Sequence, residues 1–164
     1  MARSTAEISV RLADPTEAEG ISACLHAAFE AFRTAYTADA FEDTVPSPAA
    51  VTTRFRTMQI FVASAGSSEV LGTIACSVNG DEGHLRGMVV RPALQGHAVA
   101  SRLLSAAETA LQSRGCRFVT LDTTAALPRA IRFYEKHGYA RSGKVGDYHG
   151  MPLYEFAKSF EGSE

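Results

Sequence analysis

The stretch from residue 88 to residue 104 limits what this chain can fold into more than any other part of it. An apolar segment over 88–90 ends at Pro92, and small residues at 96, 98 and 100 lead into an apolar run with helical spacing. A proline ends a central strand because it cannot donate to the ladder, and small side chains allow a tight turn. The stretch therefore predicts a buried strand, a short turn and a helix that packs back against the sheet.

The remaining segments predict a mixed α/β domain rather than a strictly alternating, doubly wound sheet. Asp14, Pro15 and Glu17 have the spacing of a helix start with a side-chain cap and a capping box. Gly115 and Gly138 mark two later helix ends. The predicted order is β-α-α-β-β-β-α-β-α-β-β, with strands at 8–12, 60–63, 70–78, 84–90, 118–121 and two within 140–160, helices at 15–33, 48–56, 99–114 and 128–137, and a loop over 36–48.

Length and charge narrow the class of protein. The chain has 164 residues and a net charge of −2, with 16 Lys and Arg against 18 Asp and Glu. A single domain over residues 1–164 is long enough to bury a sufficient core, and the near-neutral balance argues against bulk attraction to nucleic acid or to an anionic membrane. The sequence shows no signal peptide and no run long enough to span a membrane, so we expect a cytoplasmic protein.

The cysteines and histidines do not have the spacing of a metal site. Cys24, Cys76 and Cys116 are odd in number and far apart, which favours reduced thiols. The histidines likewise show no ligand spacing. We therefore expect no metal.

The turn over residues 95–101 is a candidate phosphate site. The first N–H groups of a helix carry partial positive charge, and small residues let a phosphate approach the backbone. Arg91, His97 and Arg102 lie close by in the sequence. The same small residues also suit a helix that merely packs closely on the sheet, and both interpretations stay open here. A dinucleotide fold and a P-loop are disfavoured, because neither glycine pattern is present.

Two motifs resemble those of the GNAT superfamily of N-acetyltransferases, which bind acetyl-coenzyme A. The first, Gln95-x-x-Ala98-x-Ala100, is similar to the family pattern Gln/Arg-x-x-Gly-x-Gly/Ala. The second, Phe-Tyr-Glu-Lys-His-Gly-Tyr over residues 133–139, is similar to Phe/Leu-Tyr-Glu-Lys-x-Gly-Phe/Tyr. Ala98 stands where glycine is usual, and alanine can take that role only if its φ is negative. The resemblance covers nearly the whole chain.

The resemblance implies a central, mixed but mostly antiparallel twisted sheet of about seven strands, flanked by four helices, with acetyl-CoA as co-substrate. The fourth strand would bind the pantetheine arm and the acetyl oxygen through its backbone, where an N–H can act as an oxyanion donor. Gly87 in that strand is consistent with a bulge that opens a slot, or with crowding by a neighbouring side chain. The implied coenzyme-binding residues are Met88, Val89, Val90, Gln95, Gly96, His97, Ala98, Val99, Ala100 and Ser101.

Tyr134 matches the general acid of the family, which protonates the thiolate that leaves the coenzyme. A helical tyrosine is by itself more often a packing residue, and the motif around it is what favours a catalytic role. Many relatives carry asparagine seven residues earlier, where this chain has Leu127.

One candidate for the base that deprotonates the amine is His84. Relatives often use a glutamate at the position held here by Arg86, and a cation cannot accept a proton. His84 lies two residues earlier on the same strand face, and imidazole titrates near neutral pH. Aromatic-amine acetyltransferases of this superfamily place a histidine at the matching position. The alternative is a solvated His84, with a chain of water molecules taking the proton.

The predicted function is transfer of an acetyl group from acetyl-CoA to a primary amine by direct attack in a ternary complex. The alternative is a non-catalytic coenzyme-binding module for regulation or interaction, which the departures at Arg86, Ala98 and Leu127 keep open. The expected partner is a small-molecule or peptide amine, and a homodimer is compatible with this assignment. By resemblance, residues 32–57 and 143–153 wall the acceptor pocket. The first of these segments carries an acidic cluster suited to a cationic amine, at Asp39, Glu42 and Asp43.

Overall fold

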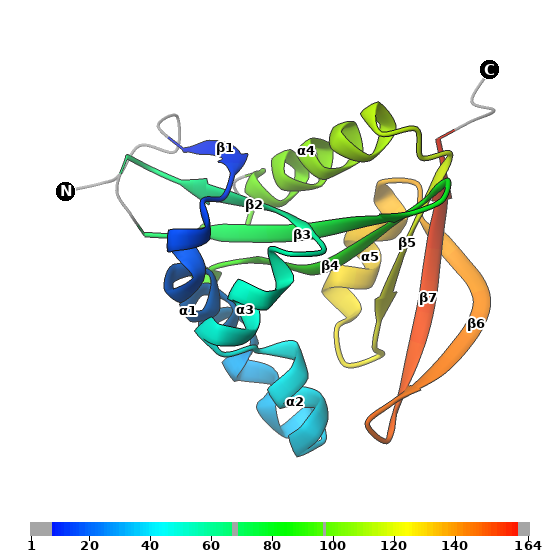
Figure 1. Cartoon of the computed structure of the whole chain (residues 1–164). Coiled ribbons are helices and arrows are strands. Elements are labelled where there is room, and N and C mark those ends of the chain that lie inside the picture. Colours follow the sequence, from blue (N-terminus) through cyan, green and yellow to red (C-terminus); the bar gives the residue numbers. More distant parts are fainter. Residues whose placement is uncertain (1–7, 67–68, 97, 161–164) are drawn as a thin grey trace.

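The structure is a computed structural model that describes residues 8–66, 69–96 and 98–160 (Figure 1). Its strands are β1 (Ser9–Leu12), β2 (Gln59–Ser64), β3 (Gly72–Asn79), β4 (Glu82–Val90), β5 (Phe118–Thr123), β6 (Ala140–Tyr148) and β7 (Met151–Ser159). They form one sheet in the order β1-β2-β3-β4-β5-β7-β6. All neighbours are antiparallel except β4 and β5, which are parallel. The predicted mixed, mostly antiparallel sheet is confirmed.

Helices cover both faces of this sheet (Figure 1). On one face, α1 and α3 pack with buried residues of β2, β3 and β4 in one hydrophobic cluster. On the other face, α4 and α5 pack against a second cluster that reaches β7. The helices are α1 (Ala18–Phe29), α2 (Ala38–Thr44), α3 (Pro48–Arg54), α4 (Val99–Ser113) and α5 (Pro128–Lys136), with short 3-10 helices at Pro15–Glu17, Glu30–Ala35 and Pro92–Leu94.

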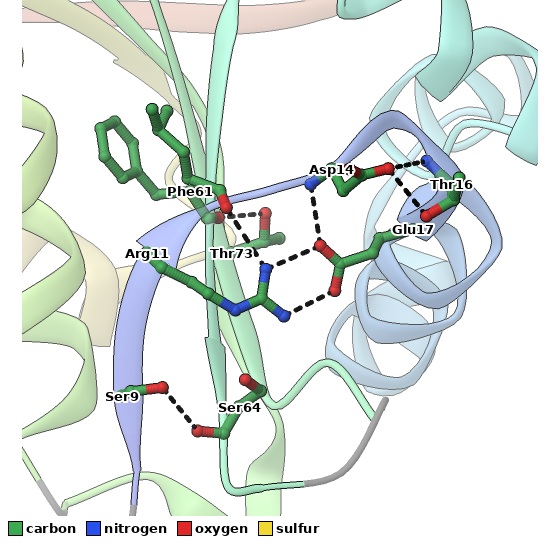
Figure 2. Close-up of polar contacts among 9 residues, drawn as sticks. Ser9, Arg11, Asp14, Thr16, Glu17, Phe61, Ser64 and Thr73 are labelled. Carbon is green, nitrogen blue, oxygen red and sulfur yellow. Dashed lines mark hydrogen bonds and ion pairs between the residues drawn. The ribbon is translucent and has the colours of Figure 1, made fainter.

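The start of the first helical segment has the predicted capping box (Figure 2). The Asp14 carboxylate accepts from the Thr16 N–H at 2.9 Å, and the Glu17 carboxylate accepts from the Asp14 N–H at 2.8 Å. Arg11 donates to both oxygens of Glu17 at 2.8 Å (Figure 2). These hydrogen bonds, the one from Arg11 above all, hold the pKa of Glu17 below its usual value.

The segment after α1 departs from the prediction in two ways. The α-helix ends at Phe29 rather than near Arg33, and a 3-10 helix, Glu30–Ala35, continues the chain. The predicted loop over 36–48 contains α2, so the described residues form five α-helices rather than four. Thr37 begins α2 by accepting a hydrogen bond from the Ala40 N–H, and buried Phe41 anchors it to the core. An N-terminal cap and one buried aromatic residue are enough to form this short helix. Its apolar pattern is too short to be detected in the sequence.

Candidate active site

β4 and β5 separate partway along the sheet, and this separation creates the candidate site. The two strands pair only between Glu82–Leu85 on β4 and Phe118–Leu121 on β5. Both strands continue beyond these partners and diverge, as Figure 1 shows. The second half of β4 therefore presents backbone groups on a side where no strand pairs with it.

A β-bulge in β4 lies at the point of separation. Arg86 is opposite Ala75 and Val89 is opposite Thr73, so two residues of β4 face a single residue of β3. Gly87 within the bulge has φ +62°, and the nearest atom to a Cβ placed there is Arg54 Nη1 at 3.4 Å. Its positive φ and its place in the bulge account for the glycine, and the Arg54 side chain also comes close to this position.

The direction of the β4 backbone can be followed from one hydrogen bond beyond its end. The Arg91 N–H donates to the Leu71 carbonyl, on the β3 side, at 2.9 Å. Because successive residues of a strand point their polar groups to opposite sides, the N–H and C=O of Val90 point toward the β5 side. There the Gln95 side chain donates to the Val90 carbonyl at 3.4 Å. The Val90 N–H has no strand to pair with.

The turn after β4 leads into α4 with two residues in the left-handed region. Gly96 has φ +91° and Ala98 has φ +62°, so the condition of a negative φ at Ala98 is not met. The turn must reverse direction before the helix, and position 98 takes the left-handed conformation that glycine would adopt without strain. The first helical bond is from the Arg102 N–H to the Ala98 carbonyl, at 3.2 Å.

This geometry leaves the N–H groups of Val99, Ala100 and Ser101 without a partner inside the helix. Since α4 begins at Val99, the turn and these three amides lie next to each other, as the sequence predicts. His97, which belongs to the predicted coenzyme-binding set, lies outside the described residues.

The two sequence motifs meet in space at the start of α4. Ser101 Oγ lies 3.2 Å from His137 Nε2, and His137 Nδ1 lies 2.8 Å from the Phe133 carbonyl. A carbonyl only accepts, so Nδ1 carries the proton and Nε2 of the neutral ring accepts from Ser101. Arg129 Nη1 adds a bond of 3.0 Å to Gln95 Oε1. These contacts hold α5 against the turn.

A cleft of about 530 Å³ occupies the space where β4 and β5 separate. Its lining combines residues from both faces of the sheet and from the β6–β7 hairpin. Met88 lines it from β4, Tyr134 from α5 and Leu153 from β7. Both segments expected to wall an acceptor pocket contribute, residues 32–57 and 143–153.

The Tyr134 ring is buried, while its hydroxyl is left to the cleft. Tyr134 is 8% exposed, and burial raises its pKa above the ordinary tyrosine value. No hydrogen bond involves the hydroxyl within residues 8–66, 69–96 and 98–160, yet no buried side-chain polar atom there lacks a partner. The hydroxyl must therefore reach open space, and the cleft that Tyr134 lines supplies it.

His84 also lines the cleft, and its protonation pattern follows from its neighbours. The Thr120 hydroxyl donates to Glu82 Oε2 at 2.7 Å, and His84 Nδ1 lies 2.8 Å from the same hydroxyl oxygen. Since that hydroxyl proton is used, Nδ1 must be the donor, and Nε2 of the neutral ring carries a free lone pair.

Asp122 faces the other nitrogen of the His84 ring, with Oδ2 at 3.6 Å from Nε2. Burial raises the pKa of Asp122, and the negative charges of Glu155 and Glu82 raise it further. A positive charge on His84 opposes this shift. A neutral His84 in this arrangement can accept a proton at Nε2 and share the resulting charge with Asp122.

Comparison with known proteins decides the family. Residues 24–139 match the acetyltransferase (GNAT) family. The chain belongs to that family. The GNAT chain is 32% identical to the IAA acetyltransferase of Azospirillum brasilense over 82 residues, which cover 50% of this chain and 54% of that protein. It is 36% identical to acetyltransferase Atu2258 of Agrobacterium fabrum over 59 residues, 36% of this chain and 42% of that protein. The matches thus span about half the length of these curated relatives.

Solved structures share the fold of the GNAT chain. The PaiA N-acetyltransferase of Thermoplasma acidophilum, in complex with coenzyme A, superposes with a TM-score of 0.77 over 93% of this chain and 99% of that one, at 17% identity. The ribosomal-protein-S18-alanine N-acetyltransferase of Escherichia coli gives 0.74 over 96% and 97%, also at 17% identity. Similarity at these identities establishes the fold of the GNAT chain.

Asp43 connects three sides of the cleft in the GNAT chain. Its carboxylate accepts from Arg86 Nη2 at 2.7 Å and from the Tyr148 hydroxyl at 2.5 Å, while Thr44 lies 3.0 Å from that hydroxyl. Burial, assisted by Asp43, raises the pKa of Tyr148 to about 12. Of the predicted acidic cluster only Asp43 lines the cleft, and its charge is already paired.

Several residues around the GNAT cleft have no signal in the sequence. Thr120 and Asp122 lie on a short apolar strand, and Arg54 ends a short helix. Tyr148 and Asp43 are separated by 105 positions, so only the folded chain brings them together. Strand alternation could have placed Asp122 on the same side of β5 as Thr120, though not beside His84.

The three cysteines are buried and take no part in the cleft. Cys24, Cys76 and Cys116 are free and buried, as reduced thiols would be, and burial raises the pKa of Cys24 to about 12 and that of Cys76 to about 11. Among the residues that the structure describes, no group of three His, Cys, Asp or Glu is placed to hold a metal ion. In the same part of the chain, no helix is long and apolar enough to cross a bilayer.

Proposed function

We propose that this protein transfers an acetyl group from acetyl-CoA to a primary amine by direct attack in a ternary complex. The observation that carries the proposal is the position of the Tyr134 hydroxyl, which opens into a cleft beside the unpaired backbone of β4. Family membership and the fold shared with a coenzyme A complex support it. In this proposal no residue carries the acetyl group covalently.

The coenzyme would lie along the end of β4 and the start of α4. The free N–H groups of Val99, Ala100 and Ser101 suit the diphosphate, because helix N-termini bind phosphate oxygens. No atom lies within 4 Å of a Cβ placed at Gly96, so the backbone there is open to a close approach. The polar groups of Val90 that point toward the β5 side suit the pantetheine amides, and the N–H of Met88, which lines the cleft, suits the acetyl oxygen.

In the reaction, the neutral amine attacks the thioester carbonyl carbon, the C–N bond forms and the C–S bond breaks. His84 Nε2 accepts the proton that the amine loses. Tyr134 gives its proton to the departing thiolate. Burial keeps Tyr134 protonated, and the same low-polarity surroundings raise the basicity of a thiolate held beside it.

The experiment is a thiol-release assay with a panel of amines, with products identified by mass spectrometry. The panel contains free amino acids, amino-acid amides, a polyamine, an aminoglycoside, a peptide with a free amino terminus and a lysine peptide. We expect one class to gain an acetyl group with one thiol released per product. Coenzyme binding without acetylation of any member would favour the non-catalytic module instead.

A further inference from the structure

Arg54 is a cleft residue that the proposed chemistry does not use. It ends α3 and lines the cleft beside the bulge, with Nη1 3.4 Å from a Cβ placed at Gly87. Its hydrogen bond is from Nη2 to the backbone carbonyl of Asp43, at 3.2 Å. Most of its five N–H donors are therefore uncommitted.

The charge of Arg54 also lacks a counterion in the described part of the chain. The Asp43 carboxylate is bound by Arg86 and by Tyr148, and no acidic oxygen lies within ion-pair distance of Arg54. Burial, with Arg86 adding repulsion, lowers the pKa of Arg54 to about 10, so it remains a cation at neutral pH. The raised pKa of Tyr148 keeps that phenol neutral, and it supplies no negative charge.

A partly buried cation without a counterion is unfavourable, and a bound anion would compensate it. Guanidinium groups pair best with carboxylates, which accept two parallel hydrogen bonds. Arg54 lies over Gly87, next to Met88, whose N–H is proposed to hold the acetyl oxygen. A carboxylate on Arg54 would therefore belong to the acceptor rather than to the coenzyme diphosphate at the start of α4.

We propose that Arg54 binds the carboxylate of the acceptor, and that the acceptor is a small amino acid whose amine is acetylated. This inference rests on the proposed acetyl transfer. Phe29, Tyr36 and Met58 line the cleft on the α1–α3 side, so an apolar side chain suits it there. Around Asp43 two arginines, Arg54 and Arg86, face one carboxylate, so this part of the cleft disfavours a polyamine. The other carboxylate of the lining, Asp122, lies beside His84.

The test compares free acids with their carboxamides as acceptors. Methionine and phenylalanine, each beside its amide, are assayed by thiol release at saturating acetyl-CoA. In the wild type we expect kcat/KM for the acid to exceed that for the amide by roughly tenfold or more, mainly through a lower KM. Arg54→Met should lower kcat/KM for the acids by roughly ten- to a hundredfold and leave the amides nearly unchanged.

The matched control is Arg56→Met, which removes an exposed arginine from the same turn and should keep the acid preference. Arg54→Lys keeps the charge without the planar fork and should recover only part of the preference. For each variant, an unchanged melting temperature and an unchanged shift on adding acetyl-CoA show that the fold and the coenzyme site are intact.

Binding of the same acids and amides to the coenzyme A-loaded protein, measured by calorimetry, reads the preference without turnover. Acid-selective binding that Arg54→Met abolishes would support the inference. Binding of acid and amide equally, or of neither, would overturn it. Acid-selective binding with no thiol release would instead contradict the proposed acetyl transfer to these amines, and the anion site would stand.

Discussion

His84 Nδ1 lies 2.8 Å from the hydroxyl oxygen of Thr120. That hydroxyl donates its proton to Glu82, so the neutral imidazole must donate from Nδ1. Its lone pair is then on Nε2, and His84 lines the cleft. A threonine that fixes the tautomer of a base is a positioning residue. With Nδ1 protonated, the hypothesis is that Nε2 of His84 accepts the proton of the amine.

Replacement of His84 by glutamine should remove the acidic limb of the pH–rate profile. Imidazole titrates between pH 5 and 8, so wild-type kcat/KM should fall as the pH drops through this range. Glutamine keeps hydrogen-bonding ability but accepts no proton, and the loss of a general base lowers the rate by about 10²–10⁴-fold. The measurement is kcat/KM against pH with an acceptor already shown to turn over.

Thr120→Val serves as the companion variant, because it keeps the side-chain shape and removes the oxygen that accepts from Nδ1. We expect a smaller loss in rate than for His84→Gln, with the acidic limb displaced rather than absent. Coincident profiles for the wild type and His84→Gln would instead favour deprotonation through water.

Gly96→Glu should prevent coenzyme binding without unfolding the protein. Acetyl-CoA stabilises the native state by mass action, so it should raise the melting temperature of the wild type. A carboxylate at position 96 would repel the diphosphate. Gly115→Glu is the matched control, since Gly115 has a similar φ of +89° and equally open surroundings at the other end of α4. A thermal shift that survives in Gly96→Glu would place the coenzyme elsewhere.

Ala98→Gly should raise the stability of the protein or leave it unchanged. Alanine in the left-handed region destabilises the folded state by roughly 1–2 kcal/mol, and glycine removes this strain. Glycine also loses more backbone entropy on folding, which offsets about 0.5–1 kcal/mol of the gain. Ala100→Gly, two residues later inside α4, should lower the unfolding free energy by about 0.5–1 kcal/mol. Chemical denaturation measures the change in unfolding free energy for both variants. If Ala98→Gly lowers the unfolding free energy as much as Ala100→Gly does, Ala98 is not strained.

Glu17→Gln should make the unfolding free energy of the protein depend less on pH in the acid range. The folded-state pKa of Glu17 is lowered, chiefly by its hydrogen bond from Arg11. Its contribution to stability is therefore complete above the unfolded pKa and is lost as the pH falls through the folded one. The stability difference between wild type and variant should be largest above about pH 5 and shrink toward pH 3. Glu30→Gln, in an exposed pair with Arg33, should show a weaker trend.

Local patterns in the sequence predicted most of the sheet. Alternation, turn residues and caps each depend on only a few neighbouring residues, and the two motifs are equally local. The Asp14 capping box formed as expected. The left-handed conformation of Ala98 has no signal in the sequence, because it depends on how the chain enters α4. The helix over 38–44 was missed because its stability comes from Phe41 packing beside Tyr36, with ring centroids 6.2 Å apart.

The cleft itself was less predictable, since its polar groups come from distant parts of the chain. Tyr134 and His84 were predicted as site residues through a motif and a strand pattern, and both line the cleft. The pairing of Asp43 with Arg86 and Tyr148 depends on how α2 and the β6–β7 hairpin close over β4. No spacing in the sequence carries that information. Because Asp43 is already paired, its carboxylate no longer argues for a cationic acceptor.

The most direct test of the account is the rate of the chemical step in Tyr134→Phe. Single-turnover thiol release should fall by about 10²–10⁴-fold while acetyl-CoA affinity stays at the wild-type value, because only the hydroxyl is lost. Tyr139→Phe, which removes a neighbouring hydroxyl bonded to Glu108 at 2.6 Å, should lower stability and leave the rate per folded molecule unchanged. A Tyr134→Phe protein that releases thiol as fast as the wild type would contradict the proposed role of Tyr134 and leave it a packing residue.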